Sequence, residues 1–226
     1  IKNRKEQLKI CLKNLAKLKN FNEHFNLIIV EDLSKKIVTE DLNKYNINFD
    51  YYLVDTNFSW SRTLLMNYGI SKTNTKLFIP VDVDFVFNEN LYDILCKYLN
   101  NVDFSKNSLA IPMIETNDTY NQVGNKIRSK FDFYPHYYIY HTDSIINNYG
   151  FDTFIKDHGF EERELQLRLK LNNHDIIFLN TLYYKDLFGL HISHNDKSRF
   201  ESNLKYNMIG NKSKREVVLK RMFEKS

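Results

Sequence analysis

The sequence is poor in the residue types that build linkers, disulfide frameworks and membrane spans. Six glycines and three prolines in 226 residues leave little room for flexible linkers, so we expect one domain over residues 1–226. Two cysteines exclude a disulfide framework and a cysteine-rich metal site. No apolar run approaches the roughly 18 residues of a membrane span, and no signal peptide is visible.

The sequence also has no large excess of positive over negative charge. The formal net charge is only +4, which is too weak to predict a nucleic-acid partner but is compatible with a phosphorylated metabolite. We expect a basic helix over residues 201–226, with a solvated charged face. The chain is predicted to be a soluble domain, cytoplasmic in a bacterium or virus. Because it begins at Ile1, it is also compatible with a piece of a longer or membrane-anchored protein.

Apolar residues are plentiful, at 42% with 15% aromatic, and their spacing predicts alternating helices and strands. This alternation is typical of an α/β sandwich around a mostly parallel sheet. The polar stretch 115–134 is predicted to be a loop region that shapes a substrate site. The helices are predicted at 4–19, 59–70, 90–99 and 161–171, and the strands at 26–30, 51–54, 77–83, 108–114 and 136–141.

Two acids interrupt the apolar run "KLFIPVDVDFVFNEN" (76–90). If the strand continues through them, Asp82 and Asp84 share one face and can point at one cation. If it stops at Val81, both acids are solvated. Acidic turns also follow the strands at Glu31-Asp32 and at Asp55, and ligands of open α/β sheets bind beyond the carboxyl ends of strands.

Five blocks of sequence, in order, resemble the β-1,4-galactosyltransferase and chondroitin-polymerase group of nucleotide-sugar glycosyltransferases. They are "KNRKEQLK" (2–9), "FSWSRTLLMNYGI" (58–70), "FIPVDVDFV" (78–86), "NNYGFDTFIKDHGFEERELQLRL" (147–169) and "HISHNDK" (191–197). The resemblance implies a GT-A (Rossmann-like) three-layer fold. It also implies a nucleotide-binding half (1–107), an acceptor and catalytic half (108–200), a UDP-sugar donor and a glycan or glycoconjugate acceptor.

The same resemblance implies a divalent cation, Mn²⁺ or Mg²⁺, that neutralises the diphosphate leaving group. Asp84 would bind it directly, while Asp82 would orient the ribose or assist through water. His194 matches the family's metal-binding histidine, and His191 stands where a second ligand occurs. Carboxylates suit both ions, and imidazole suits Mn²⁺. A histidine alone is more often a hydrogen-bonded core residue.

The block "GFEERELQLRL" implies the catalytic acids. Glu162 corresponds to the general base that takes the acceptor proton, and Glu161 to the acid that binds the acceptor. The alternative is that both merely favour a helix N-terminus. Two departures bear on the acceptor, because Glu162 stands where relatives have Asp, and residues 158–160 are His-Gly-Phe instead of Trp-Gly-Gly.

Several further residues correspond to nucleotide contacts of the family. Asp32 would accept the uracil N3–H, Arg62 would reach the diphosphate, and an aromatic ring would pack near the base. For each basic residue the alternative is a surface salt bridge. The remaining candidates are Lys2 and Arg4 for the uridine and phosphates, and Phe58 or Trp60 for the base.

The resemblance predicts an inverting, metal-dependent glycosyltransferase that uses a UDP-hexose or UDP-N-acetylhexosamine. The residue types alone leave two alternatives open. One is a metal-dependent phosphoesterase or nuclease built on the same acids. The other is a non-catalytic carbohydrate-binding module, which the Asp-to-Glu change at the base position keeps open.

Overall fold

The computed structural model describes residues 5–32, 42, 44–55, 61–112, 114–115, 136–155, 161–178 and 189–191. Its helices are α1 (Lys5–Leu15), α2 (Phe21–His24), α3 (Arg62–Lys72), α4 (Leu91–Leu99), α6 (Thr142–Asn147) and α7 (Glu161–Leu171). Its strands are β1 (Leu27–Asp32), β2 (Phe49–Val54), β3 (Leu77–Phe78), β4 (Phe85–Phe87), β5 (Asn107–Pro112), β6 (Ile114–Glu115), β7 (His136–His141), β8 (Asp175–Phe178) and β9 (Gly189–His191).

The described strands pair in three groups. β1 and β2 are parallel, with Leu27 level with Phe49 and Asp32 level with Val54. A four-stranded sheet has the order β3-β7-β5-β8, in which only the β5–β8 pair is parallel. A third group has the order β4-β9-β6, antiparallel and then parallel. Parallel pairs therefore stand beside antiparallel ones.

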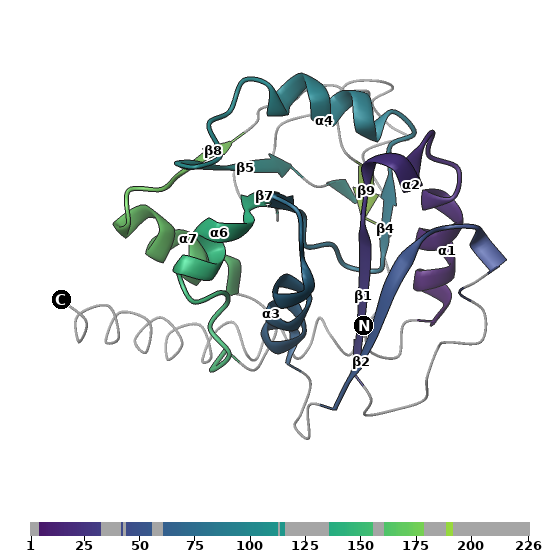
Figure 1. The fold of residues 1–226 in the computed structure, drawn as a ribbon, viewed down its shortest axis with the longest axis horizontal. Helices are drawn as coiled ribbons and strands as arrows, with labels where there is room; N and C mark the ends of the chain where they lie inside the picture. Colours follow the sequence, from purple (N-terminus) through teal and green to yellow (C-terminus); the bar gives the residue numbers. More distant parts are fainter. Residues whose placement is uncertain are drawn as a thin grey trace.

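Helices cover both faces of the strands, which makes the predicted three-layer α/β sandwich (Figure 1). Successive residues of β5 and β7 belong to two different cores, as the alternation of a strand requires. One core joins the inner faces of α1 and α4 to Leu109, Ile111 and Ile139. The other joins α3, α6 and α7 to Ala110 and Tyr140.

The predicted strand 77–83 is wrong in extent. β3 ends at Phe78, residues 79–82 have no regular structure, and a turn at Val83-Asp84 leads into β4. Pro80 has no N–H to donate to a neighbouring strand, which favours an early end of pairing. Asp82 and Asp84 therefore do not share a strand face. Glu31 and Asp32 also differ from their prediction as a turn, because they are the last residues of β1.

The four predicted helices are present, with α3 beginning at Arg62 instead of 59 within the described residues. The ambiguous stretch 161–171 is a helix, as predicted. Short elements that lack a full period of apolar residues were not predicted, namely α2, α6, β4, β8 and β9. Of β6, only Ile114 was predicted, as the end of the strand 108–114. The predicted helix 201–226 and nearly all of the loop 115–134 lie outside the described residues.

Two absences noted in the sequence have counterparts in the structure. Cys11 on α1 and Cys96 on α4 are free thiols. Among the helices that the structure describes, none is long and apolar enough to cross a membrane.

Candidate active site

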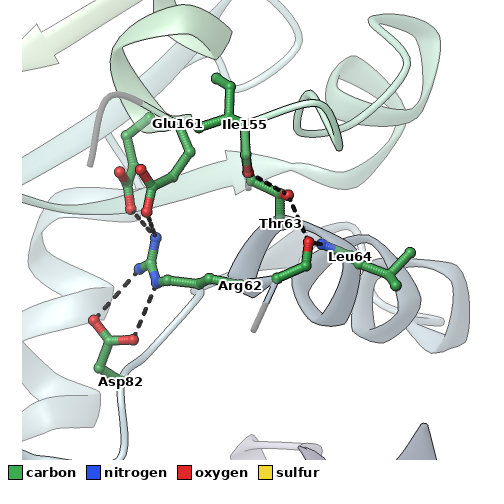
Figure 2. Close-up of polar contacts among 8 residues, drawn as sticks. Arg62, Thr63, Leu64, Asp82, Ile155 and Glu161 are labelled. Carbon is green, nitrogen blue, oxygen red and sulfur yellow. Dashed lines mark hydrogen bonds and ion pairs between the residues drawn. The ribbon is translucent and has the colours of Figure 1, made fainter. Parts of the chain in front are cut away.

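The site begins at the first turn of α3, which two side-chain contacts hold in place. Ser61 caps the helix, because its Oγ accepts from the Leu64 N–H at 3.3 Å. The Thr63 hydroxyl donates to the Ile155 carbonyl at 3.3 Å and so ties α3 to the segment before α7 (Figure 2). The backbone of Arg62, between these two residues, is therefore fixed from both sides.

Arg62 joins three acidic side chains that lie far apart in the sequence (Figure 2). Its Nε and Nη2 lie 3.2 and 3.4 Å from the two carboxylate oxygens of Asp82. Its Nη1 donates to Glu161 at 2.9 Å and also to Glu162. One guanidinium thus connects the D-x-D turn to the first turn of α7.

Burial sets the electrostatics of this cluster. The Arg62 side chain is 13% exposed, Glu161 only 1%, Glu162 27% and Asp82 42%. Burial lowers the pKa of Arg62, but the charges of Asp82, Glu162 and Glu161 outweigh burial and hold that pKa well above its usual value. Burial and the charge of Glu162 raise the pKa of Glu161, while Arg62 opposes the rise. The guanidinium stays charged, and Glu161 is the most buried of the three acids that it contacts.

Asp84, the second acid of the D-x-D motif, lies in the turn before β4 and is buried, with 5% exposure. Burial and then the Asp84 charge raise the pKa of Cys11 to about 12. The pKa of Tyr137 is also raised, first by burial and then by the charges of Asp82 and Asp84. The charge of Asp84 therefore acts on Cys11 of α1 and on Tyr137 of β7, and Tyr137 is also reached by the charge of Asp82.

The hydroxyl of Tyr137 was not predicted as part of the site. The residue is 7% exposed, its ring lies 4.2 Å from the Phe85 ring, and its hydroxyl has no hydrogen-bond partner among the described residues. Only the position of "HYYIYH" at the start of a predicted strand could have drawn attention to it. The joining of the D-x-D turn to α7 by Arg62 was also not predicted, since no sequence spacing encodes it.

Asp32 is the last residue of β1 and is 1% exposed. Beside it, Glu31 accepts a hydrogen bond from the Tyr51 hydroxyl on the neighbouring strand β2. The two strands are parallel, so Asp32 stands at their carboxyl end, where ligands of α/β sheets bind. Its role in uracil recognition stays a prediction.

His191 is described only through its backbone. It is the last residue of β9 and pairs with Phe85, the residue after Asp84. This register brings the chain at His191 beside the D-x-D turn. Among the described side chains, no three from His, Cys, Asp and Glu are arranged to hold a metal ion. Five predicted site residues lie outside the described part of the chain, namely Lys2, Arg4, Phe58, Trp60 and His194.

The structure brings the buried guanidinium of Arg62 together with acidic side chains from both halves of the chain. Glu162, partly exposed and held by Arg62, can accept a proton, and the acids around Asp82 and Asp84 can attract cations. This combination is suited to group transfer from a phosphorylated donor.

The sequence profile of Glycosyl transferase family 2 matches residues 1–189, so the chain belongs to this family of glycosyltransferases, and the predicted GT-A fold is confirmed. No curated protein sequence matches the chain.

Solved structures resemble the chain in fold. S. aureus TarS has a TM-score of 0.65 at 17% identity, over 85% of this chain and 35% of TarS. TarS 1–349 in complex with UDP has a TM-score of 0.64 at 17% identity, over 84% of this chain and 58% of that one. The mannosyltransferase PcManGT from Pyrobaculum calidifontis, with GDP-Man and Mn²⁺, has a TM-score of 0.59 at 10% identity, over 85% and 54%.

A Drosophila β-1,4-galactosyltransferase 7 matches at a TM-score of 0.48 and 16% identity, over 77% of this chain and 72% of that one. The chain spans about a third of the TarS chain and between half and two thirds of TarS 1–349 and PcManGT.

Proposed function

We propose that this family 2 glycosyltransferase is inverting and metal-dependent. It moves a hexose or N-acetylhexosamine from a UDP-sugar to a hydroxyl group of a glycan or glycoconjugate acceptor. The observation that carries the proposal is the position of Arg62 between Asp82 and the pair Glu161 and Glu162. Arg62 thereby joins the D-x-D motif to the two acids that the resemblance places at the acceptor.

The charge of the site favours a cation that arrives with the donor. Asp82, Asp84, Glu161 and Glu162 set four carboxylates against the single guanidinium of Arg62, an excess of negative charge when all are ionised. A diphosphate would be repelled by that excess, because charges a few ångströms apart interact strongly in a partly buried site. A divalent cation offsets both the acids and the diphosphate.

The residues fit such a cation in type. Asp84 would hold it through a buried carboxylate, and His191 or His194 would add imidazole, which Mn²⁺ accepts. The pairing of β9 with β4 supports His191, because it brings that backbone beside Asp84. When bound, the cation would stabilise negative charge on the departing diphosphate.

A residue of the protein, Glu162, would accept the proton that the acceptor hydroxyl loses. The acceptor O–H would give its proton to the Glu162 carboxylate, and the acceptor oxygen would form a bond to the anomeric carbon. The bond from that carbon to the β-phosphate oxygen would break with its electron pair on UDP. A single displacement of this kind inverts the anomeric configuration. Glu161 would bind the acceptor.

The choice of UDP rests on two supports. TarS structures contain UDP and UDP-GlcNAc, and the five sequence blocks resemble UDP-sugar enzymes. PcManGT, with GDP-Man, is the reason to include other nucleotides in the test. Asp32 would read the uracil N3–H, Lys2 and Arg4 would contact the uridine and phosphates, and Phe58 would pack near the base.

The test is nucleotide release from a panel of UDP- and GDP-sugars, with Mn²⁺, with Mg²⁺ and with EDTA. We expect UDP release from one UDP-sugar that depends on the metal, and NMR of the product should show an inverted anomeric centre. Asp84→Asn should abolish release. Asp93→Asn, on the exposed face of α4, is the matched control and should leave release unchanged.

Two outcomes would contradict the proposal. Hydrolysis of phosphodiesters without release from any nucleotide sugar would point to a metal-dependent phosphoesterase. Binding of UDP-sugar and glycan with no turnover would point to a carbohydrate-binding module.

A further inference from the structure

The first acid of the D-x-D motif, Asp82, contacts the side chain of Arg62. Both oxygens of Asp82 lie on the Nε and Nη2 edge of Arg62, at 3.2 and 3.4 Å. The remaining nitrogen, Nη1, donates to the two glutamates of α7 (Figure 2). Asp82 thus contacts the arginine that holds the proposed catalytic base.

Because the guanidinium is planar and rigid, a contact that fixes one of its edges also fixes the orientation of the other edge. A carboxylate that meets two nitrogens on one edge sets the plane of the group and the direction of the other edge. With the start of α3 fixed by the Ser61 cap and by the Thr63 contact to Ile155, the rotation that remains is that of the Arg62 side chain. Asp82 restrains that rotation.

We propose that Asp82 is a positioning residue for the base: it orients Arg62, and Arg62 holds one oxygen of Glu162 so that the other can accept the acceptor proton. The proposal deepens the proposed function and rests on it. It assigns Asp82 to the acceptor side of the reaction, whereas Asp84, the buried acid of the motif, serves the donor. The two acids of the D-x-D motif then act on different substrates, one on the acceptor and one on the donor.

The test is Asp82→Asn, which keeps the size of the side chain but removes its charge. If Asp82 acts through Glu162, Mn²⁺-dependent UDP binding measured by calorimetry should stay within about 3-fold of wild type, because the donor contacts remain. The kcat for transfer should fall by about 10²-fold, the cost of a misplacement of about 1 Å, and the KM for the donor should not change. Asp84→Asn, the matched change two residues away, should lose UDP binding instead.

A double variant shows whether the effect passes through the base. Asp82→Asn combined with Glu162→Gln should be no slower than Glu162→Gln alone, because residues that act as a unit are not additive. Multiplied losses would mean that Asp82 acts independently. Loss of UDP binding by Asp82→Asn as severe as that of Asp84→Asn would overturn the proposal.

A spectroscopic readout does not depend on activity. The Nε–H resonance of Arg62, identified by its absence in Arg62→Lys, should shift in Asp82→Asn and in Glu162→Gln, and stay in place in Asp93→Asn. If Asp82→Asn does not fold, Asp82→Glu keeps the charge on a longer side chain and should still lower kcat with UDP binding retained. An Arg62 Nε–H resonance that does not shift in Asp82→Asn would refute the coupling between Asp82 and Arg62. A wild-type protein that binds no nucleotide sugar would instead refute the proposed function.

Discussion

Replacing Arg62 by Met should destabilise the folded protein, because it leaves buried acids without their cation. Met keeps much of the length and apolar stem of the side chain, so lost packing contributes little. What is removed is the charge that Glu161 and Glu162 contact through Nη1. The perturbation therefore tests the electrostatics of the site without any substrate.

The magnitude follows from burial. Removing one partner of a buried ion pair costs about 3–5 kcal/mol. Asp82 is 42% exposed, so solvent screens its share and we assign it none, whereas Glu161 is 1% exposed and bears most of the loss. We expect a loss near the low end, about 3 kcal/mol. For a chain of this length that corresponds to a fall in Tm of about 6–12 °C.

The loss should depend on pH with a definite sign. The pKa of Glu161 is raised by burial and by Glu162, and Arg62 opposes the rise, so removing Arg62 raises that pKa further. An acid whose pKa is raised on folding contributes most to stability below its unfolded pKa, near 4.5, and this contribution is lost as pH rises through the folded pKa. The difference between variant and wild type should therefore be large at pH 7 and shrink towards pH 4.5.

The assay is urea unfolding of both proteins at pH 7 and pH 4.5, with circular dichroism as the probe. Arg163→Met, on the exposed face of α7, is the control and should change stability by less than about 0.5 kcal/mol. Adding Glu161→Gln to Arg62→Met should recover most of the loss at pH 7. A loss below about 0.5 kcal/mol at pH 7, or one of equal size at both pH values, would refute the reasoning.

Three further changes test other parts of the site. Glu162→Gln should slow transfer by roughly 10²–10⁴-fold in steady-state assays with Mn²⁺-dependent UDP binding retained, and a wild-type rate would place the base elsewhere. Asp32→Ala should weaken UDP binding more than ADP binding in calorimetry, whereas equal losses would make Asp32 structural. Tyr137→Phe should raise stability to urea by about 1 kcal/mol, because its buried hydroxyl has no partner among the described residues, and a loss would show that the hydroxyl is bonded in solution.

Local pattern was sufficient for most of the architecture. Apolar residues at helical spacing predict α1 and α4, and acidic residues in the first turn of α7 predict that helix. These signals depend only on neighbours in the chain. The five ordered blocks predicted a glycosyltransferase of the GT-A fold, and the match to Glycosyl transferase family 2 confirms this prediction. Short strands such as β4 and β9 were missed, since two or three residues show no period and their pairing is long-range.

The arrangement around Arg62 was decided only in three dimensions. The sequence by itself determined the α/β class, the family and a set of candidate acids, because residue type and local spacing encode them. It did not determine that the strand ends before Asp82 and Asp84, or that Arg62 lies between Asp82 and Glu161. Those contacts join segments about 20 and 100 residues apart, and only the packing of α3 and α7 around the strands brings them within hydrogen-bond distance.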